Sequence, residues 1–322
     1  MKNIIRSTYA NLYLNAADGL GLQYRIEDKE ASIAYIFNKH KEIRLESHRL
    51  RLNTDKSRAR SLDKETTSTL LQKAHIPVPA FEVFTDRAKA IQYASEKVKN
   101  HIGIVIKPTN GSNAIGITIH PTTQIQVRKA VKDAFRKVEK IIIEDHIFGN
   151  HYRITVLDGE IIAVTQRIPA YVITDGIRTI KELILQKNLV RAKKKLPLIT
   201  LRDKDFNYLR SARIKLTDIY PHGGNMRLQH GCDYDVGGER LRIAIDSIPQ
   251  VNQRLFIKAV GVLKLRFGGI DYISPDITTP YTQIHTAINE INGAPHQDVH
   301  HLDRYPYDNY AAIRIIEKIF QD

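Results

Sequence analysis

Runs of hydrophobic residues with two different periods divide the chain into short strands and amphipathic helices. A short apolar run, mostly of β-branched residues, predicts a buried strand at 102–106. Residues 123–140 carry apolar side chains at helical spacing, which predicts an amphipathic helix. Asp158–Gly159 separates two apolar runs and predicts a β-hairpin of residues 151–157 and 160–167. Helices and strands therefore alternate through the chain.

The same periodicities, together with glycine and proline breaks, predict the remaining elements. We expect helices at residues 8–20, 61–74, 86–99, 179–187 and 251–267. We expect strands at residues 22–26, 33–37, 43–45, 81–84, 117–119, 141–143, 171–174, 268–273 and 287–292. Residues 188–212 are basic and lack a clean period, which indicates a loop or a flap. The pattern predicts a small N-terminal α/β piece, followed by further helices and strands.

The composition is that of a globular protein with an excess of basic residues. Of 322 residues, 42% are hydrophobic and 26% are charged. The 49 Lys and Arg against 35 Asp and Glu give a formal charge of +14, which favours an anionic partner. The basic residues recur in several runs without a zinc-finger or RNA-recognition signature. We therefore expect nucleotide phosphates or an acidic substrate rather than nucleic acid.

Cysteine content and hydropathy limit the class of protein further. The single cysteine, Cys232, excludes a disulfide framework and any multi-cysteine zinc site. Residues 1–22 contain no long apolar core, so we expect no signal peptide. No apolar run reaches the roughly 18 residues that a membrane span needs. We expect a cytoplasmic protein without a membrane partner.

The stretch 102–118 joins a strand, a cation and a loop rich in small residues. Lys107 and Pro108 end the strand, and the loop runs from Thr109 to Gly116. Glycines allow the backbone to approach a polyanion, and exposed N–H groups in such a loop form an anion-binding concavity. The loop fits Gly-x-x-x-x-Gly, but no Lys-Ser/Thr and helix follow it, which disfavours a P-loop. From this stretch alone, a phosphate-binding loop and an ordinary glycine-rich hairpin remain open.

Oxygen-bearing side chains interrupt two apolar strands near the C-terminus. Glu290 and Asn292 are two residues apart, so they project from one face of a strand. Asp271 lies on another short strand that is also flanked by isoleucines. A carboxylate in a core strand needs a partner, and Mg²⁺ prefers carboxylates, waters and substrate phosphates. These residues predict a magnesium site; the alternative is a solvated sheet face.

Six segments, in this order along the chain, resemble the ATP-grasp superfamily. They are Asp63–Lys64, Ile76–Pro79, Ile104–Pro108, Ile142–His146, Gly269–Asp271 and Asn289–Asn292. Gln166–Gly176 and Thr179–Leu183 are similar in particular to the ATP-grasp domain of cyanophycin synthetases and bifunctional glutathione-synthesis enzymes. The resemblance covers roughly residues 50–297. It implies an α/β (α+β) ATP-grasp fold in which two α+β subdomains sandwich ATP.

The resemblance implies three parts. Residues 1–60 would form a reduced N-terminal α/β domain. Residues 61–150 would form the central ATP-grasp subdomain with the glycine loop, and residues 151–322 the C-terminal subdomain with the Mg²⁺ and acceptor sites.

The resemblance also implies how ATP is held. The contacts to the phosphates would come from Lys64, Lys107 and the loop residues Asn110, Gly111, Ser112 and Gly116, and Lys107 would also contact the adenine side. The contacts to adenine would come from Glu144 and the backbone from Asp145 to Ile147. His151 stands where the family often has an acidic ribose contact, so this chain departs from the family there.

Further roles follow from the resemblance at the reacting end of the nucleotide. Arg167 and Arg153 would steady the transferring phosphoryl group, because arginine stays charged and presents a fork of donors. Asn225 matches an asparagine of the same region in relatives. Mg²⁺, or Mn²⁺ in its place, would be held by Asp271, Glu290 and Asn292.

The sequence departs from the family pattern after Asn292. His296 stands where relatives usually have glycine, which indicates a reshaped acceptor pocket. His296, His300 and His301 also suggest a metal site, but solvated imidazoles are the favoured interpretation for such a polar segment.

The resemblance predicts an ATP- and Mg²⁺-dependent carboxylate–amine ligase that forms an amide through an acyl phosphate. Positioning and charge neutralisation would do most of the work, since phosphoryl transfer needs little covalent help. We expect an amino acid or peptide as the acceptor. Members of the family are often oligomeric, so the resemblance is compatible with a homo-oligomer. Two alternatives are a small-molecule kinase of the same fold and a nucleotide- or nucleic-acid-binding protein without turnover.

Overall fold

The computed structural model describes residues 4–110, 116–301 and 310–321. Contacts divide the chain into a larger unit, residues 1–165 with 242–322, and a smaller unit, residues 166–241. No helix in the described part of the chain combines the length and the apolar character needed to cross a membrane. The three-part division expected from the sequence is finer than these two units and remains a prediction.

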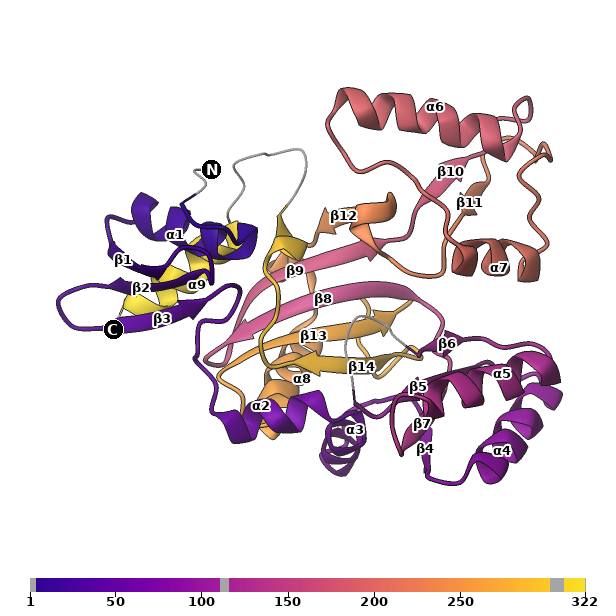
Figure 1. The fold of residues 1–322 in the computed structure, drawn as a ribbon, viewed down its shortest axis with the longest axis horizontal. Coiled ribbons are helices and arrows are strands. Elements are labelled where there is room, and N and C mark those ends of the chain that lie inside the picture. The colour runs from indigo at the N-terminus through magenta and orange to yellow at the C-terminus, as the bar shows by residue number, and fades with distance from the viewer. Residues whose placement is uncertain (1–3, 111–115, 302–309, 322) are drawn as a thin grey trace. The chain divides into compact units, whose positions relative to one another are not determined.

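The N-terminal segment forms a helix packed against a three-stranded antiparallel sheet (Figure 1). The elements are α1 (Thr8–Gly19), β1 (Gln23–Asp28), β2 (Ile33–Phe37) and β3 (Glu42–Glu46). Ser7 caps α1 because its side chain accepts a hydrogen bond from the Ala10 N–H. The last helix, α9 (Tyr310–Phe320), packs beside α1 and shares its core. The N-terminal elements follow the predicted pattern, but α9 was not predicted.

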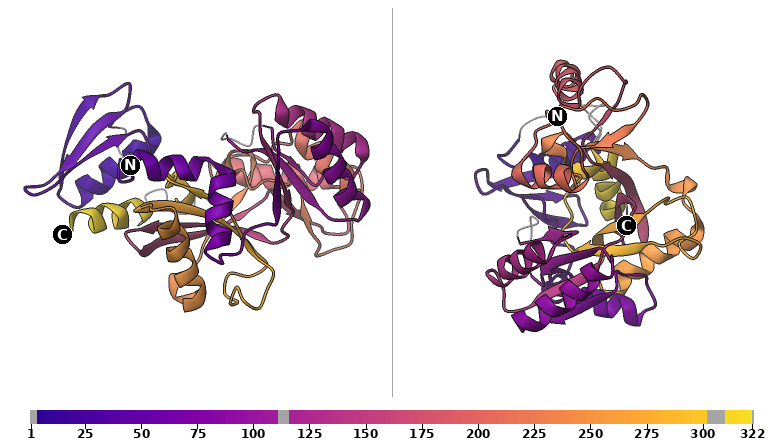
Figure 2. Two further views of the ribbon diagram at one scale, coloured as in Figure 1. Left: turned by 90° about the horizontal axis from the view of Figure 1, so that it is seen from below. Right: turned by 90° about the vertical axis from the view of Figure 1, so that its right-hand side faces the viewer.

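The central part of the larger unit is a four-stranded sheet in the order β4-β7-β5-β6. Its elements are β4 (Phe81–Phe84), α4 (Arg87–Lys99), β5 (Ile104–Pro108), β6 (Thr118–Ile119), α5 (Gln124–Phe135) and β7 (Ile141–Asp145). Helices α4 and α5 cover one face of this sheet (Figure 2). Ile104, Ile106, Ile141 and Ile143 pack under them. Because strand side chains alternate, Lys107 and Glu144 lie on the opposite face.

The large sheet has the strand order β12-β9-β8-β13-β14. The strands are β8 (Asn150–Leu157), β9 (Glu160–Ile168), β12 (Glu239–Arg242), β13 (Phe267–Ser274) and β14 (Ala287–Asn292). Helices α2 (Asp55–Leu62), α3 (Lys64–Lys73) and α8 (Gln250–Val262) contact it, and α3 and α8 share a core with it. The predicted hairpin is confirmed, with positive φ at both Asp158 and Gly159.

The smaller unit contains two helices and a two-stranded sheet around its own core. Its elements are β10 (Tyr171–Ile173), α6 (Ile180–Lys193), α7 (Asp203–Ser211) and β11 (Asn225–Arg227). The chain enters this unit at the end of β9 and leaves it at the end of β12. Three short 3₁₀ helices, η1 (Tyr234–Val236), η2 (Ile245–Ser247) and η3 (Asp298–His300), complete the described elements.

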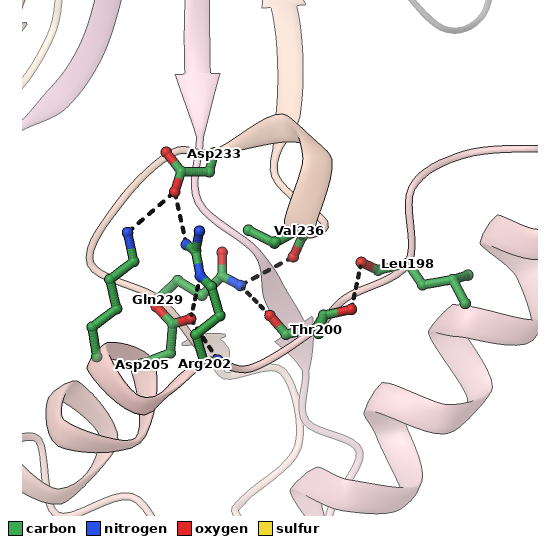
Figure 3. Close-up of polar contacts among 8 residues, drawn as sticks. Leu198, Thr200, Arg202, Asp205, Gln229, Asp233 and Val236 are labelled. Atoms are coloured by element: carbon green, nitrogen blue, oxygen red, sulfur yellow. Dashed lines mark hydrogen bonds and ion pairs between the residues drawn. The ribbon is translucent and has the colours of Figure 1, made fainter. Parts of the chain in front are cut away.

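The expectation of a loop or flap at residues 188–212 is wrong. Thr179 and Glu182 form a capping box that starts α6, which continues to Lys193. Arg202 donates to Asp205 and Asp233, and this anchors the start of α7 (Figure 3). Local capping and ion pairs thus support helices in a basic segment for which the sequence indicated a loop or a flap.

Buried polar contacts hold the connection between α6 and α7 in place. The Gln229 amide donates to the backbone oxygens of Thr200 and Val236, at 3.0 Å each (Figure 3). Gln229 is fully buried, so its amide nitrogen finds backbone partners in place of water.

Candidate active site

A row of polar side chains crosses β8, β13 and β14 in the larger unit. Arg153 pairs in register with Asp271, and Asp271 pairs with Glu290. Residues directly opposite each other in a sheet share a face, so these three side chains lie side by side. The other face of the same strands is apolar and packs on α8. Its residues are Tyr152, Ile154, Ile270, Tyr272, Ile288 and Ile291.

A β-bulge in β14 makes this division of faces work. Asp271 pairs with Glu290, but the next residue, Tyr272, pairs with Ile288, so Asn289 is extra. Ile288 and Ile291 are three residues apart, and in a strand without a bulge such residues point to opposite faces. Because the bulge takes up Asn289, both isoleucines reach the core, and Glu290 points away from it.

Asp271 and Arg153 form a two-point ion pair on the polar face. The Arg153 Nε donates to Asp271 Oδ1 at 2.7 Å, and Nη2 donates to Oδ2 at 3.2 Å. Asn292 Nδ2 lies 3.5 Å from the same Oδ2. Gly269 makes room for this arrangement, because a Cβ there would lie 2.5 Å from Pro295 and 3.2 Å from Arg153 Nη1. The structure therefore brings Arg153, Asp271 and Asn292 together.

Glu290 stands in the field of several charges. Burial raises its pKa, and the neighbouring carboxylate of Asp271 raises it further. Lys64, Lys107 and Arg153 oppose this increase, which brings cations from three other elements to the same carboxylate. Two adjacent carboxylates surrounded by cations form a site where added anions and a divalent ion can balance each other.

Lys107 and Glu144 form a buried ion pair between neighbouring strands. The Lys107 Nζ lies 2.7 Å from Glu144 Oε2, and both side chains are almost fully buried. The carboxylate predicted to meet adenine is thus bonded to the lysine predicted to meet phosphate. Both residues lie on the sheet face away from α4 and α5, the side on which Lys107 also reaches the field of Glu290.

Lys64 is the first residue of α3, and its charge acts on Glu290 of the large sheet and on Lys107 of the four-stranded sheet. Asp63 caps the helix by accepting from the Thr66 N–H at 2.6 Å. The Lys64 N–H donates to the Thr109 oxygen, which ties the helix start to the end of β5. Burial lowers the pKa of Lys64, and Glu290 is the strongest opposing charge. Lys64, Lys107 and Glu290 therefore belong to one cluster.

The predicted adenine segment follows β7. The N–H groups of Asp145 and His146 donate to Ala80 and Gly103, at 2.8 Å each. The Asp145 carboxylate accepts from Lys97 at 2.7 Å. No described residue accepts from the Ile147 N–H, so that group remains available for a ligand.

The structure describes only some of the other residues predicted to contact ATP. His151 lies on β8, two residues before Arg153 and on the same face. Asn110 is exposed, and Gly116 has φ +77° with its Cβ position 3.0 Å from Pro108. Gly111 and Ser112 lie outside the described residues.

Arg167 and Asn225 belong to the smaller unit. Arg167 lies near the end of β9, and Asn225 is an exposed residue that pairs with Ile173. Arg227 donates to the backbone oxygens of Gln229 and His230, so its guanidinium is held by its own loop. The predicted roles of Arg167 and Asn225 rest on the family resemblance alone.

The C-terminal histidines make protein contacts instead of gathering around a metal. His300 is buried, and its two ring nitrogens lie 2.8 Å from the hydroxyls of Thr155 and Thr165. His296 stacks on His48. Across the described residues, no group of three or more His, Cys, Asp or Glu side chains could hold a metal. The contacts of His48 had no signal in the sequence, because its partner is 248 positions away (296 minus 48).

Known proteins that are similar to this chain form a consistent set. Residues 70–176 match the family described as D-ala D-ala ligase C-terminus. The chain is 30% identical over 275 residues to a cyanophycin synthetase of Geminocystis herdmanii, covering 81% of this chain and 30% of that protein. It is 28% identical over 269 residues to the glutathione biosynthesis bifunctional protein GshAB of Streptococcus agalactiae, covering 81% of this chain and 36% of that protein. The chain therefore spans about a third of the length of these two relatives.

Solved structures show the same fold at lower identity. A bifunctional glutathione synthetase from Pasteurella multocida superposes with a TM-score of 0.66 at 22% identity, covering 99% of this chain and 44% of that chain. A D-alanine–D-alanine ligase from Bacillus anthracis superposes with a TM-score of 0.52 at 14% identity, covering 84% of this chain and 70% of that chain.

Proposed function

Because this chain contains an ATP-grasp domain of the D-ala D-ala ligase C-terminal family and its homologues are C–N bond-forming ligases, we propose that it is an ATP- and Mg²⁺-dependent carboxylate–amine ligase. The acceptor in this proposal is an amino acid or a peptide. The observation that carries it is the cluster in which Lys64, Lys107 and Arg153 act on Glu290 beside Asp271. Cations and paired carboxylates at one place suit a phosphoryl group bridged to a divalent ion.

The residues present fit a magnesium ion. Asp271, Glu290 and Asn292 would hold it through oxygen atoms, the ligand type that Mg²⁺ prefers. Asp271 also accepts from Arg153, but a carboxylate has about four lone-pair sites and retains acceptor capacity. When bound, the ion would neutralise negative charge on the nucleotide phosphates. Burial and, after it, the neighbouring Asp271 carboxylate raise the pKa of Glu290, and a bound divalent ion would favour the charged form of both carboxylates.

In the proposed reaction, an oxygen of the substrate carboxylate attacks the γ-phosphorus as the bond to ADP breaks. The amine nitrogen of the second substrate then attacks the acyl carbon, phosphate leaves, and an amide remains. Lys64 and Lys107 would neutralise the phosphates, and Arg153 would steady the transferring phosphoryl group through its fork of donors. A partly buried cluster strengthens these electrostatic interactions relative to water.

The test is ATP turnover with a panel of amino acids and dipeptides, supplied singly and in pairs with Mg²⁺. We expect release of ADP and phosphate together with a product whose mass equals two substrates less one water. Glu290→Gln, which preserves the side-chain shape, should lower kcat by about 100-fold or more, the range typical of lost transition-state electrostatics. Lys129→Ala is a control, because Lys129 is an exposed lysine of α5 that forms a local ion pair with Asp133.

Three results would contradict the proposal. A phosphorylated product without free phosphate would identify a kinase. Retention of full activity in Glu290→Gln would remove the cluster from the mechanism. Absence of ADP formation with the whole panel, combined with salt-sensitive binding to single-stranded nucleic acid, would indicate a binding protein.

A further inference from the structure

A pair of stacked imidazoles lies just beyond the end of β14 in the larger unit. The rings of His48 and His296 are 3.9 Å apart between centroids with 18° between their planes. Tyr9 of α1 meets His296 edge-on at 4.5 Å. His296 is exposed to solvent. Segments from both ends of the chain therefore form one accessible surface, four positions after Asn292.

Two arginines place surplus positive charge beside these rings. Arg58 packs next to Gly293, where a Cβ would lie 3.2 Å from Arg58 Cγ. Its nearest carboxylate among the described residues is the exposed Asp55, at 4.0 Å. Arg49 is exposed and makes no ion pair with a described residue. The guanidinium groups are thus available to a ligand.

Burial and the charges of the arginines change the pKa of both imidazole rings. Burial lowers the pKa of His48 to about 4, and His296, Arg49 and Arg58 act in the same direction while Asp298 opposes them. Desolvation by its neighbours lowers the pKa of His296 too, although part of its surface is exposed; Arg153 and Arg49 add to this and Asp298 opposes it. Both imidazoles are therefore uncharged at neutral pH, and the net positive charge resides on the arginines.

This surface adjoins the proposed transfer site through a short piece of backbone. Asn292 is a candidate Mg²⁺ ligand, and the next residue, Gly293, packs against Arg58. Pro295 packs on Gly269, which also adjoins Arg153, and His296 then stacks on His48. A guanidinium binds a carboxylate through two parallel hydrogen bonds, and a neutral imidazole can both stack and donate. The arrangement suits a small anion held a few residues from the reacting atoms.

We propose that Arg49 and Arg58, with His48 and His296 as the floor, bind a non-reacting carboxylate of the amino-acid or peptide substrate and select anionic substrates. This inference rests on the proposed ligase function, because it concerns the substrate of that reaction. It assigns the N-terminal segment a part in substrate choice.

Steady-state kinetics test the inference once a substrate from the panel supports turnover. Arg49→Gln and Arg58→Gln should each raise the KM for that substrate by about tenfold or more, since a hydrogen bond to a charged group contributes about 1.5–3 kcal/mol. The KM for ATP should change by less than about twofold. Arg128→Gln is the matched control, because Arg128 is an exposed arginine on α5.

A carboxamide version of the same substrate separates recognition from structural damage. The wild type should use it about tenfold less well than the acid, and Arg58→Gln should discriminate between the two much less. Unchanged KM in both arginine variants, or equal use of acid and amide by the wild type, would overturn the inference and leave the ligase function standing.

A binding measurement keeps the inference testable if no substrate turns over. Glutarate is added to the full chain, and the ring proton signals of His48 and His296 are followed by NMR. We expect these signals to shift in the wild type and in Arg128→Gln, and to stay in place in the double variant of Arg49 and Arg58. Equal shifts in all three proteins, or none in the wild type, would refute the carboxylate site.

Discussion

At the scale of single residues, the ion pair of Lys107 and Glu144 is a contact of the candidate site that is closed off from solvent. Each side chain is at most 4% exposed, so neither charge can turn to water if its partner is removed. The loss of one partner of a buried ion pair costs more than the loss of both, because an unpaired charge remains in the interior.

This asymmetry gives a stability prediction. Lys107→Met should lower the free energy of unfolding by about 3–5 kcal/mol, and the addition of Glu144→Leu should recover a large part of the loss. Urea denaturation of both variants measures the difference. A double variant that is less stable than Lys107→Met would contradict the expected coupling.

The pKa of His48 gives a second prediction at this scale. Its value of about 4 in the folded protein lies below the ordinary value of 6.5. The unfolded state of this residue therefore binds more protons between these two values, and the contribution of His48 to stability falls as the pH decreases from about 6.5 to about 4. Above pH 6.5 the full contribution of the neutral ring is present.

NMR titration of the His48 ring should give a midpoint near 4. Denaturation of His48→Gln across the same pH window should show a weaker pH dependence than the wild type. A midpoint near 6.5 would mean that the ring is not desolvated by its partners in solution.

At the scale of elements, several helices end on a left-handed residue other than glycine. α3, α4, α6, α7 and α8 are followed by His75, His101, Lys195, Arg213 and Lys264, all with φ between +56° and +58°. After α4, the Ile102 N–H donates to the Lys97 oxygen and the His101 N–H to the Val98 oxygen. These are the hydrogen bonds of a Schellman motif, in which glycine is the preferred residue.

His101→Gly should therefore increase the free energy of unfolding by about 0.5–1 kcal/mol, because glycine adopts positive φ without a steric penalty. Lys99→Gly, two residues earlier and inside the helix, should decrease it by about 1 kcal/mol. Thermal denaturation of the two variants distinguishes the effects by sign. A loss of stability in both would show that the left-handed position is not strained.

These helix ends also explain what the sequence could and could not predict. The apolar periods located most helices and strands, and the Asp158–Gly159 turn was readable because its residues have a strong local preference. α8 ends at Val262, five residues before the predicted end, because Lys264 rather than glycine adopts the left-handed conformation. A helix that ends without a glycine or a proline cannot be recognised from the residue types at its end.

At the scale of the whole molecule, chain ends that are distant in sequence share one core. α9 packs with α1 and with Leu157, Ile162 and Phe267 of the large sheet. Glu290 and Asn292 were predictable as a pair because they are two residues apart on one strand, whereas Asp271 meets them through the pairing of β13 with β14. The His48–His296 contact and the docking of α9 were not, since they depend on tertiary packing that no periodicity encodes.

The shared core gives a prediction for the larger unit. Ile315 is fully buried in it, and Ile315→Ala should lower the free energy of unfolding by about 2–5 kcal/mol. Ile125→Ala is the matched control, because Ile125 is 80% exposed on α5 and should change stability by less than about 0.5 kcal/mol. Equal effects in the two variants would mean that α9 does not contribute to this core.

The bulge in β14 has a consequence for the design of a similar site in another protein. Core-facing residues of a regular strand are two positions apart, but the bulge at Asn289 lets Ile288 and Ile291 face the core at a separation of three. The same sequence built as a regular strand without the bulge would direct Glu290 into the apolar core and place Ile291 on the polar face. The irregularity must travel with the carboxylate.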